Sequence, residues 1–388
     1  MFEVAIPTWV NICIDPVLGG PVETFLLDGK TPSDQSFRRT RVNARQIYTM
    51  CHASMLGVAD ALPVAEELFA YLLDRCWQGP DKGWAKTITP EGAILDPTPD
   101  FYDFAFCLFG LGWFYRATRN TDALKLAHQT LDILEQKFRH PSGKGFHNQL
   151  PPTLPRQQNP HMHLMEAALV LAQASGEARF RDLADEMAQL FYSSFFQNRT
   201  NILPEFFSEE LTPLIESNLN RLEPGHHFEW AWILSQHQLL TGQNHEIIVQ
   251  ALVSGAEKYG IDPNTQLTYN SLDKNLVPID RGSRTWPNTE RIKGWLGLYE
   301  LTGISPWESV GKCCNALFSH HLSETAPPGM WVDAFDHAAR PKSTDIPSST
   351  FYHLFLAFSE IMRLGNRLPK RKVQKPETAA PYGVDRVN

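Results

Sequence analysis

The chain lacks the features by which several protein classes are recognised. It has no run approaching the roughly 18 apolar residues of a transmembrane helix. Its first residues, MFEVAIPTWVNICIDP, contain neither a basic segment nor a small-residue cleavage site, so we expect no secretory signal. Basic residues are not in excess: 35 Lys and Arg stand against 43 Asp and Glu, a net charge of −8 that argues against a nucleic-acid partner.

Cysteine pairs and common catalytic signatures are also missing. None of the six cysteines forms a Cys-x-x-Cys pair, and four lie in apolar helical patterns, where free thiols pack as small hydrophobic side chains. This usage predicts a reduced, cytoplasmic protein. The sequence has no GxGxxG, no GxxxxGK followed by Ser or Thr, no GxSxG and no HExxH. Nucleotide, serine-hydrolase and zinc-protease chemistry lack support, and we expect no cofactor.

What the sequence does contain is a repeated helical pattern. With 388 residues, 43% of them hydrophobic, the chain can bury a large core. Six segments with helical periodicity each follow a loop rich in Pro, Gly or polar residues: 40–57, 100–118, 159–176, 224–242, 286–303 and 348–365. Four of them end at a glycine, a common helix stop, at Gly176, Gly242, Gly303 and Gly365.

Five of these segments are followed by a second helix of different character. The first helices are apolar or small nearly all round, whereas the second helices, such as 180–196 and 307–322, carry charges on one face. We therefore expect an inner and an outer set. One polar residue near the start of each first helix recurs at separations of 58, 60, 66, 61 and 63 residues: Arg45, Asp103, His163, Glu229, Glu290 and His353. This recurrence predicts an all-α (α/α)6 barrel of six inner and six outer helices. An open solenoid is the alternative, although solenoid repeats usually span about 20–50 residues.

A closed ring would bring one end of all six inner helices together. Because these helices run in the same direction, the six polar residues are expected at one end, in a pocket lined by Arg, His and carboxylates. Four long loops feed this end, and their turn-rich stretches predict short hairpins or lids: 82–100, 201–225, 264–287 and 329–348. We expect a single catalytic domain over residues 1–368 and a polar tail over 369–388.

Two histidines are the candidates for proton transfer. His226 and Glu229 lie three residues apart in EPGHHFEWAWIL, on one helical face, and a histidine beside a carboxylate can act as acid or base near pH 7. His353 lies among aromatic residues in STFYHLF, where burial should lower its pKa and make it a base. The alternative for His226 is that it only satisfies buried carbonyl groups, the role we expect of its neighbour His227.

Other polar residues of the inner helices are candidates for holding hydroxyl groups. Asn159 precedes His163 by four residues, so the two can line one wall, whereas His161 and His163 point about 200° apart on a helix, which disfavours a metal site. Trp286 and Glu290 pair an aromatic platform with a carboxylate, a common way to hold a sugar ring. The alternative for this pair is a core tryptophan with a capping glutamate.

Arg45, Tyr102 and Asp103 complete the predicted ring of polar residues. Arg45 is expected to neutralise one of the pocket carboxylates, because an uncompensated buried charge is costly. Asp103 is expected to cap or tether its helix rather than act on a ligand.

Together these motifs resemble a known family. RVNARQ, YDFAF, QNPHMHLMEA, PGHHFEWAWIL, WPNTE and STFYHLF, in this order between residues 38 and 363, resemble the N-acylglucosamine 2-epimerase superfamily, which includes D-mannose isomerases, sulfoquinovose isomerases and cellobiose 2-epimerases. The resemblance implies an (α/α)6 barrel without a catalytic metal. It implies that His226 and His353 form the general acid/base pair. It also implies substrate contacts from Arg45, Tyr102, Asn159, His163, Glu229, Trp286 and Glu290.

Within the superfamily, QNPHMHLMEA and PGHHFEWAW are most similar to the mannose isomerase branch. The activity implied is the interconversion of a free aldose and its 2-ketose through a cis-enediol, of the D-mannose/D-fructose or D-lyxose/D-xylulose type. A sugar 2-epimerase, a sulfoquinovose isomerase, a glycoside hydrolase using Glu229 and Glu290, and a non-catalytic sugar-binding module are the alternatives. The expected partner is a monosaccharide substrate. We expect no binding to membranes or to nucleic acid. The protein is expected to be a monomer or a homodimer.

Overall fold

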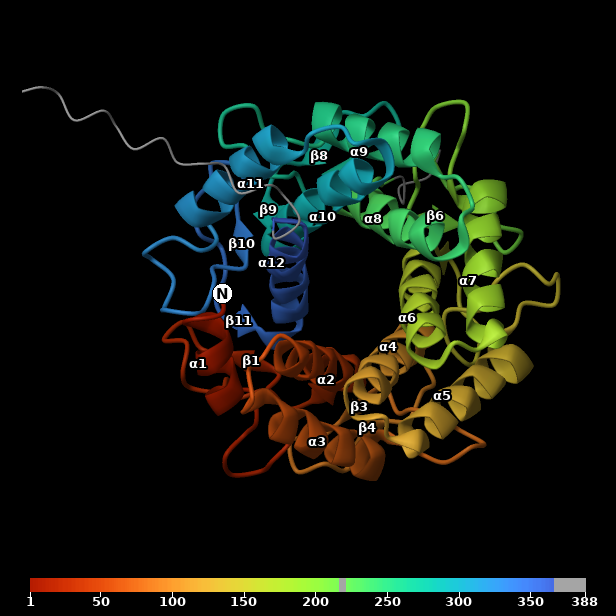
Figure 1. Ribbon diagram of the computed structural model, residues 1–388, viewed down its shortest axis with the longest axis vertical. Helices are drawn as coiled ribbons and strands as arrows, with labels where there is room; N and C mark the ends of the chain where they lie inside the picture. The colour runs from red at the N-terminus through yellow and green to blue at the C-terminus, as the bar shows by residue number, and fades with distance from the viewer. Residues whose placement is uncertain (216–220, 366–388) are drawn as a thin grey trace, which may run out of the picture.

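Six helices form an inner ring in the computed structural model, which describes residues 1–215 and 221–365 (Figure 1). Each coincides with one of the six predicted segments: α2 (Thr40–Met55), α4 (Phe101–Thr118), α6 (Asn159–Ser175), α8 (Pro224–Thr241), α10 (Thr285–Thr302) and α12 (Phe351–Gly365). The last of them, α12, contacts the first, α2, so the ring closes. The fold is therefore the predicted (α/α)6 barrel and not an open solenoid.

A second layer of helices surrounds the ring. Five outer helices follow inner ones in the chain: α3 (Ala61–Tyr71), α5 (Thr121–Ile133), α7 (Ala178–Leu190), α9 (Glu246–Tyr259) and α11 (Trp307–Ser319). The sixth position is taken by α1 (Ala5–Ile12), whose buried Trp9 packs on Phe351 of α12 with ring centroids 4.4 Å apart (Figure 1). The first residues of the chain thus complete the layer that the last residues leave open.

The inner helices are buried nearly all round because both layers cover them. Every residue of α4 from Phe101 to Phe114 except Tyr102 is buried, whereas α5 alternates between buried and exposed positions. Gly110 allows α4 to approach α2 closely, since a Cβ there would lie 2.8 Å from the carbonyl oxygen of Ala44. The predicted glycine stops are confirmed as left-handed C-caps at Gly176, Gly242 and Gly303, while Gly365 is the last described residue of α12.

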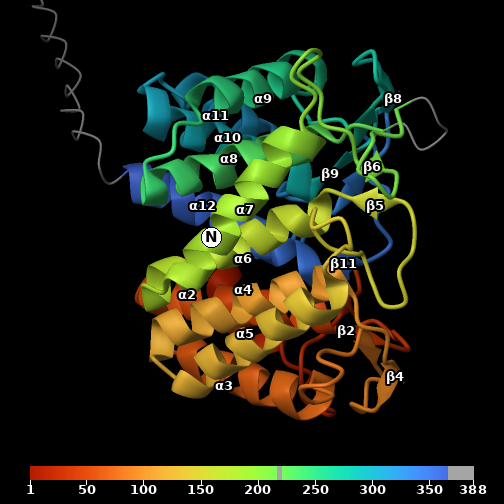
Figure 2. The same ribbon diagram turned by 90° about the vertical axis from the view of Figure 1, so that its right-hand side faces the viewer.

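Short antiparallel strands gather at one end of the barrel, where the inner helices begin (Figure 2). The hairpins predicted in loops 82–100 and 264–287 are confirmed as β3 (Thr87–Ile88) with β4 (Ile94–Asp96) and β7 (Ser271–Leu272) with β8 (Pro278–Asp280). The strands in the other two loops, 201–225 and 329–348, pair with strands outside their own loop. These loops therefore connect parts of the chain that are distant in sequence. These pairs are β5 (Arg156–Gln157) with β6 (Phe206–Phe207), β9 (Ser283–Arg284) with β10 (Ala334–Phe335), and β1 (Thr24–Phe25) with β11 (Ile346–Pro347); β2 (Arg38–Arg39) joins β3.

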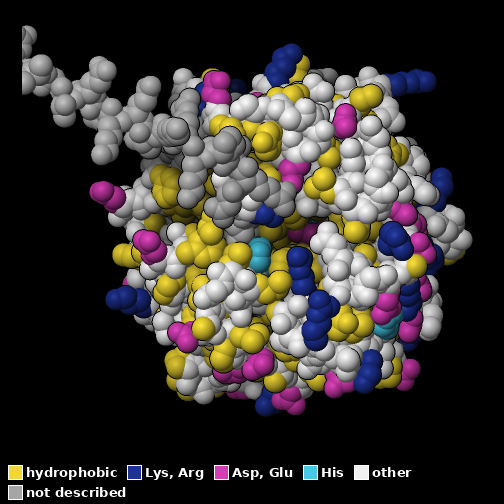
Figure 3. Space-filling view, viewed as in Figure 1, with side chains coloured by type: hydrophobic (Ala, Val, Ile, Leu, Met, Phe, Trp, Pro, Cys, Tyr) yellow, Lys and Arg dark blue, Asp and Glu magenta, His cyan; other side chains and the backbone are white. Residues whose placement is uncertain are grey.

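The opposite end of the barrel carries charges of both signs. Figure 3 views that face, and in its coloured part acidic and basic side chains are interspersed without a continuous patch of one sign. None of the described helices combines the length and apolar character needed to cross a membrane. The predicted tail, 369–388, lies outside the described residues, as do 366–368 of the predicted domain.

Candidate active site

A cavity of about 230 Å³ lies at the end of the barrel that carries the strands. All the predicted site residues except Glu290 line it, together with six that were not predicted: the full lining is Arg45, Tyr102, Gln157, Asn159, His163, Glu205, Phe206, Arg221, Glu223, His226, Glu229, Arg284, Trp286 and His353. Larger hollows of about 740 and 450 Å³ lie between the loops and beside α1. Volume alone does not identify the site; the smaller cavity is where the candidate residues meet.

His226, in the first turn of α8, is held by two carboxylates. Its Nδ1 lies 2.9 Å from Oε2 of Glu205 and 3.8 Å from Oε2 of Glu223. Burial lowers the pKa of His226, but the attraction of Glu205 and Glu223 outweighs burial and raises this pKa to about 9. The ring is therefore an imidazolium near neutral pH, which suits a proton donor.

His353, in the first turn of α12, has the opposite proton preference. Its Nδ1 lies 2.7 Å from Oε1 of Glu290, a fully buried residue of α10. Burial, with the positive charges of Arg45 and Lys293, lowers the pKa of His353 well below its ordinary value, in agreement with the sequence-based expectation. The ring is neutral near pH 7 and suits a base.

Trp286 lies between the two histidines. Its ring centroid is 4.9 Å from that of His226 and 5.7 Å from that of His353. Gly225 makes room for the indole, because a Cβ at that position would lie 2.5 Å from the Trp286 ring. The tryptophan is thus a flat wall between a protonated and a neutral imidazole, and not only a core side chain.

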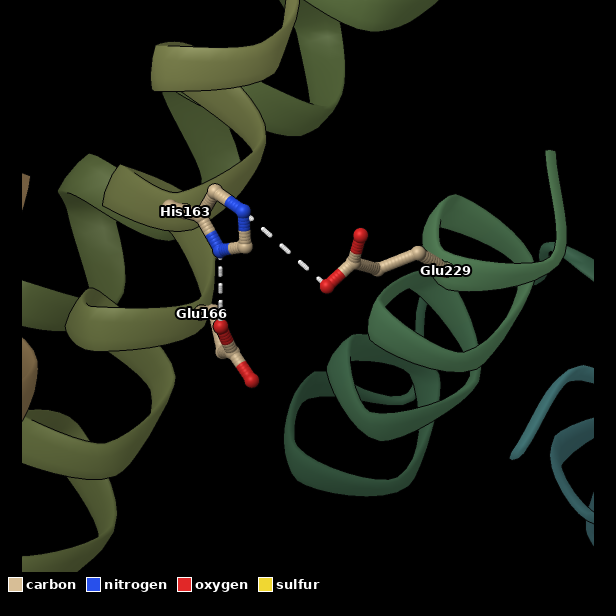
Figure 4. Close-up of side chains that lie close together, drawn as sticks. All are labelled: His163, Glu166 and Glu229. Carbon is tan, nitrogen blue, oxygen red and sulfur yellow. Dashed lines mark hydrogen bonds and ion pairs between the residues drawn. The ribbon is translucent and has the colours of Figure 1, made fainter. Parts of the chain in front are cut away.

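His163 connects two inner helices, α6 and α8, through the contacts drawn in Figure 4, and Tyr352 extends this polar network to α12. Its Nδ1 lies 3.0 Å from Oε2 of Glu166 on the same helix, and its Nε2 lies 4.0 Å from Oε1 of Glu229 on α8. The hydroxyl of Tyr352, on α12, donates to the same Glu229 oxygen at 3.2 Å. Burial lowers the pKa of His163 to about 3 and raises that of Glu166 to about 7.

Arg45 does not neutralise a pocket carboxylate, contrary to the expectation from its position. Its Nη2 donates to the hydroxyl of Tyr102 at 2.8 Å and its Nη1 to the carbonyl oxygen of Ser349 at 3.1 Å, while the guanidinium lies 4.0 Å from the Phe106 ring. Glu290 is paired with Lys293 instead. Arg45 keeps its charge available beside the cavity.

Three residues considered in the sequence have structural roles. Asp103 is fully buried and accepts hydrogen bonds from the backbone and side chain of Arg41, both at 3.1 Å, which tethers α4 to α2. The expectation that all six marked residues face one pocket is therefore wrong for Asp103 and also for Glu290, which is absent from the cavity lining, whereas the expectation that Asp103 tethers its helix is confirmed. His227 donates to the carbonyl oxygen of Glu223, as expected for a packing residue. His161 is likewise held by backbone groups, at 2.9 and 3.0 Å.

Several polar atoms at the cavity are buried without a hydrogen-bond partner among the described residues. They are Arg45 Nε, Asn159 Oδ1, Glu205 Oε1, Glu229 Oε2 and Trp286 Nε1. Buried polar groups are nearly always hydrogen-bonded in proteins. Because this set contains both donors and acceptors, it fits a ligand rich in hydroxyl groups, each of which can donate and accept.

Histidine and glutamate side chains also meet in three sets whose donor atoms lie within 4.8 Å of one another, the spacing that a metal ion requires. The sets are His163, Glu166 and Glu229; Glu205, Glu223 and His226; and Glu229, Glu290 and His353. In each set a histidine nitrogen already lies against a carboxylate oxygen, at 3.0, 2.9 and 2.7 Å respectively. Direct hydrogen bonding accounts for all three arrangements, so a catalytic metal is not required to explain them.

Glu205, Glu223 and Lys293 were missed by the sequence reasoning. Glu205 lies in a loop, 21 residues before His226, and no periodicity could place it there. Glu223 and Lys293 could have been predicted from their spacing. Glu223 lies three residues before His226 and Lys293 three residues after Glu290, so each is about one helical turn from a predicted site residue.

Comparison with known proteins agrees with this geometry. Residues 20–357 match the family described as N-acylglucosamine 2-epimerase (GlcNAc 2-epimerase). The chain is 30% identical over 369 residues to a mannose-6-phosphate isomerase of Rhizobium meliloti (strain 1021), covering 92% of this chain and 94% of that one. Among solved structures it is similar to a D-mannose isomerase, with a TM-score of 0.85, 19% identity and coverage of 94% and 96%. It is also similar to the cellobiose 2-epimerase of Spirochaeta thermophila DSM 6192, with a TM-score of 0.83, 20% identity and 94% coverage of both chains.

The match over most of the chain, the closed helical barrel and the histidine-lined cavity lead to one conclusion. The chain belongs to the N-acylglucosamine 2-epimerase family and is an enzyme of the sugar isomerase and epimerase superfamily.

Proposed function

We propose that the enzyme interconverts a free aldose and its 2-ketose, of the D-mannose/D-fructose or D-lyxose/D-xylulose type. The observation that carries the proposal is the pair of histidines on either side of Trp286, each with its Nδ1 fixed by a glutamate. Because Nδ1 is engaged in both rings, Nε2 is the nitrogen left for the substrate. One protonated and one neutral imidazole supply an acid and a base to the same sugar.

The proposed reaction begins with ring opening. His226 donates its proton to the ring oxygen as the bond from that oxygen to C1 breaks, and the proton of the C1 hydroxyl passes through solvent back to His226, which leaves the aldehyde. His353 then removes the C2 proton to give a cis-enediolate. Transfer of this proton to C1, with the O2 proton passing to O1, gives the ketose. Removal of a proton beside a carbonyl needs stabilisation of the developing oxyanion, which we assign to Arg45 and His163.

The relatives' names support an isomerase, since one similar sequence is called a mannose-6-phosphate isomerase and one similar structure a D-mannose isomerase. The second candidate is a 2-epimerase, favoured by the similarity to a cellobiose 2-epimerase; it would return the proton to the opposite face of C2. A glycoside hydrolase using Glu229 and Glu290 is disfavoured, because both oxygens of Glu290 lie against His353 and Lys293, away from the cavity lining.

Product analysis by NMR in D2O tests the proposal. The panel is mannose, lyxose, glucose, N-acetylmannosamine, cellobiose and sulfoquinovose. We expect mannose to give fructose, and any solvent deuterium in the product to lie at C1. A C2 epimer as the only product would contradict the isomerase assignment, and no conversion of any free aldose would contradict the proposed function altogether.

A further inference from the structure

Lys293 is a buried cation near His353, the proposed base. No step of the proposed reaction involves this lysine. It lies on α10, one turn after Glu290, and both residues are fully buried. Its Nζ lies 2.7 Å from Oε2 of Glu290 and 4.3 Å from the ring centroid of Trp232. At this distance the ammonium and the carboxylate form a buried ion pair. A buried charge is costly unless it is paired, and this pair holds its two charges together.

Glu290 connects this cation to His353. One carboxylate oxygen, Oε2, faces Lys293, and the other, Oε1, lies 2.7 Å from Nδ1 of His353. The three side chains therefore form a continuous row from ammonium to carboxylate to imidazole. Only His353, at the end of this row, lines the cavity.

The ionised form of Glu290 depends on its neighbours. Burial, together with the charge of Glu229, raises the pKa of Glu290 well above its ordinary value, and Lys293 opposes this rise. Burial would lower the pKa of Lys293, but Glu290, Glu229 and Glu166 outweigh burial and raise it, so the lysine stays protonated. Lys293 is therefore the group that favours a carboxylate at position 290.

We propose that Lys293 is a positioning residue, which keeps Glu290 ionised and thereby fixes His353 as the tautomer with its proton on Nδ1. An ionised Glu290 can only accept, so Nδ1 must donate, and the Nε2 lone pair is then available for the C2 proton. A protonated Glu290 would instead donate to Nδ1 and leave the proton on Nε2, where the ring cannot act as a base. This inference rests on the proposed function in taking His353 as the base.

Because of the charges around His353, we expect Lys293 to control which nitrogen of the imidazole carries the proton. We do not expect it to change the net charge near the ring. The facing groups come from five elements: Arg45 on α2, His163 on α6, Glu229 on α8, Arg284 on β9, and Glu290 and Lys293 on α10. Loss of Lys293 removes one positive charge, and the proton that Glu290 then takes up removes one negative charge. The sum of charges near the ring stays the same, while the position of the imidazole proton changes.

The test compares Lys293→Met, Glu290→Gln and the double variant with the wild-type enzyme. We expect each single variant to lower kcat roughly 10–100-fold, the usual effect of groups that orient a catalytic histidine, with KM within about threefold. The double variant should be no slower than Glu290→Gln: in the single variant the ammonium of Lys293 attracts the amide oxygen and turns the donating NH2 toward Nδ1, and without the lysine nothing favours that orientation. The control is Arg291→Gln, on the same helix: Arg291 is equally buried but pairs with Glu257 on the outer side, so its removal should leave kcat within about threefold.

Circular dichroism establishes that each variant is folded. If Lys293→Met does not fold, the double variant carries the test, since it removes both charges and leaves no unpaired one. Multiplicative losses in the double variant, or a Lys293→Met enzyme with more than half the wild-type kcat, would overturn the inference while leaving the proposed function intact. A wild-type enzyme inactive on every free aldose would overturn the proposed function itself.

Discussion

His226, on α8, and His353, on α12, line the same cavity, and each has its Nδ1 against a glutamate oxygen, at 2.9 and 2.7 Å. Their proton preferences nevertheless differ: the pKa of His226 is raised to about 9, and that of His353 is lowered. The difference arises from the surroundings. Two carboxylates, Glu205 and Glu223, face His226, whereas the positive charges of Lys293, Arg45 and Arg284 act on His353.

This contrast shows that a histidine–glutamate hydrogen bond does not by itself determine whether the ring is an acid or a base. The balance of charge around the ring decides it, and the charged groups come from different parts of the chain for the two rings. Substitutions of the rings and of the residues around them test whether these surroundings set the difference.

Removal of either imidazole should give the largest effect. We expect His226→Asn and His353→Asn each to lower kcat by roughly 10²–10⁴-fold, the contribution of a positioned acid or base. Steady-state kinetics with the sugar identified by the NMR panel measures the effect. The matched control is His227→Asn, next to His226 but turned into the packing, which should lower stability more than kcat. Near-full turnover in either site variant would show that the ring is not a catalytic group.

Removal of the carboxylate beside His226 should shift the pH dependence. If His226 acts in its protonated form, wild-type kcat should fall as the pH rises through about 9, because the raised pKa is where the proton is lost. Glu205→Gln removes the main cause of the raised pKa, so the fall should begin at lower pH, with about a tenfold loss at the alkaline end. Glu210→Gln, exposed on the same loop, is the control. An unchanged alkaline limb would contradict the assignment of His226 as the acid.

Replacement of Trp286, which lies between the two histidines, should have a moderate effect on binding of the sugar. We expect Trp286→Leu to raise KM roughly 2–10-fold, which corresponds to the 0.5–1.5 kcal/mol typical of an aromatic contact. Trp295→Leu on the same helix is the control, because Trp295 donates to Glu257 on the outer side of α10. Equal changes in KM for the two variants would mean that the indole of Trp286 does not contact the sugar.

Treatment with a chelator should have the smallest effect. Each histidine–carboxylate set is explained by direct hydrogen bonds, so we expect activity to persist after prolonged dialysis against EDTA. The measurement is kcat before and after dialysis. Loss of activity that a divalent cation restores would assign a metal to one of the three sets.

The sequence was sufficient for the barrel and for most of the cavity lining, because both depend on periodicity. A sixfold recurrence fixes which helix ends meet, and His226, Glu229 and His353 follow from their places in those ends. Six outer helices were predicted, but the segment that forms the sixth was not, since α1 comes from the other end of the chain and belongs to no repeat. Glu205 was not foreseen because it reaches the site from a loop.

The partners of each side chain were harder to predict than its position. Arg45 was expected to pair with a carboxylate, but Tyr102 and the carbonyl oxygen of Ser349 hold it instead. Such choices depend on distances of an ångström or two between helices that are far apart in sequence. Periodicity gives the face on which a residue lies, not which neighbour across the barrel it contacts.

Nitrogen-15 NMR of the imidazole rings tests the central claim most directly. The enzyme is labelled at histidine, and the signals of the two rings are assigned from His226→Asn and His353→Asn. The account predicts that His226 stays doubly protonated until the pH approaches about 9, while His353 stays neutral at pH 7 with its proton on Nδ1. Titration of both rings together near the ordinary histidine pKa of about 6.5 would contradict it.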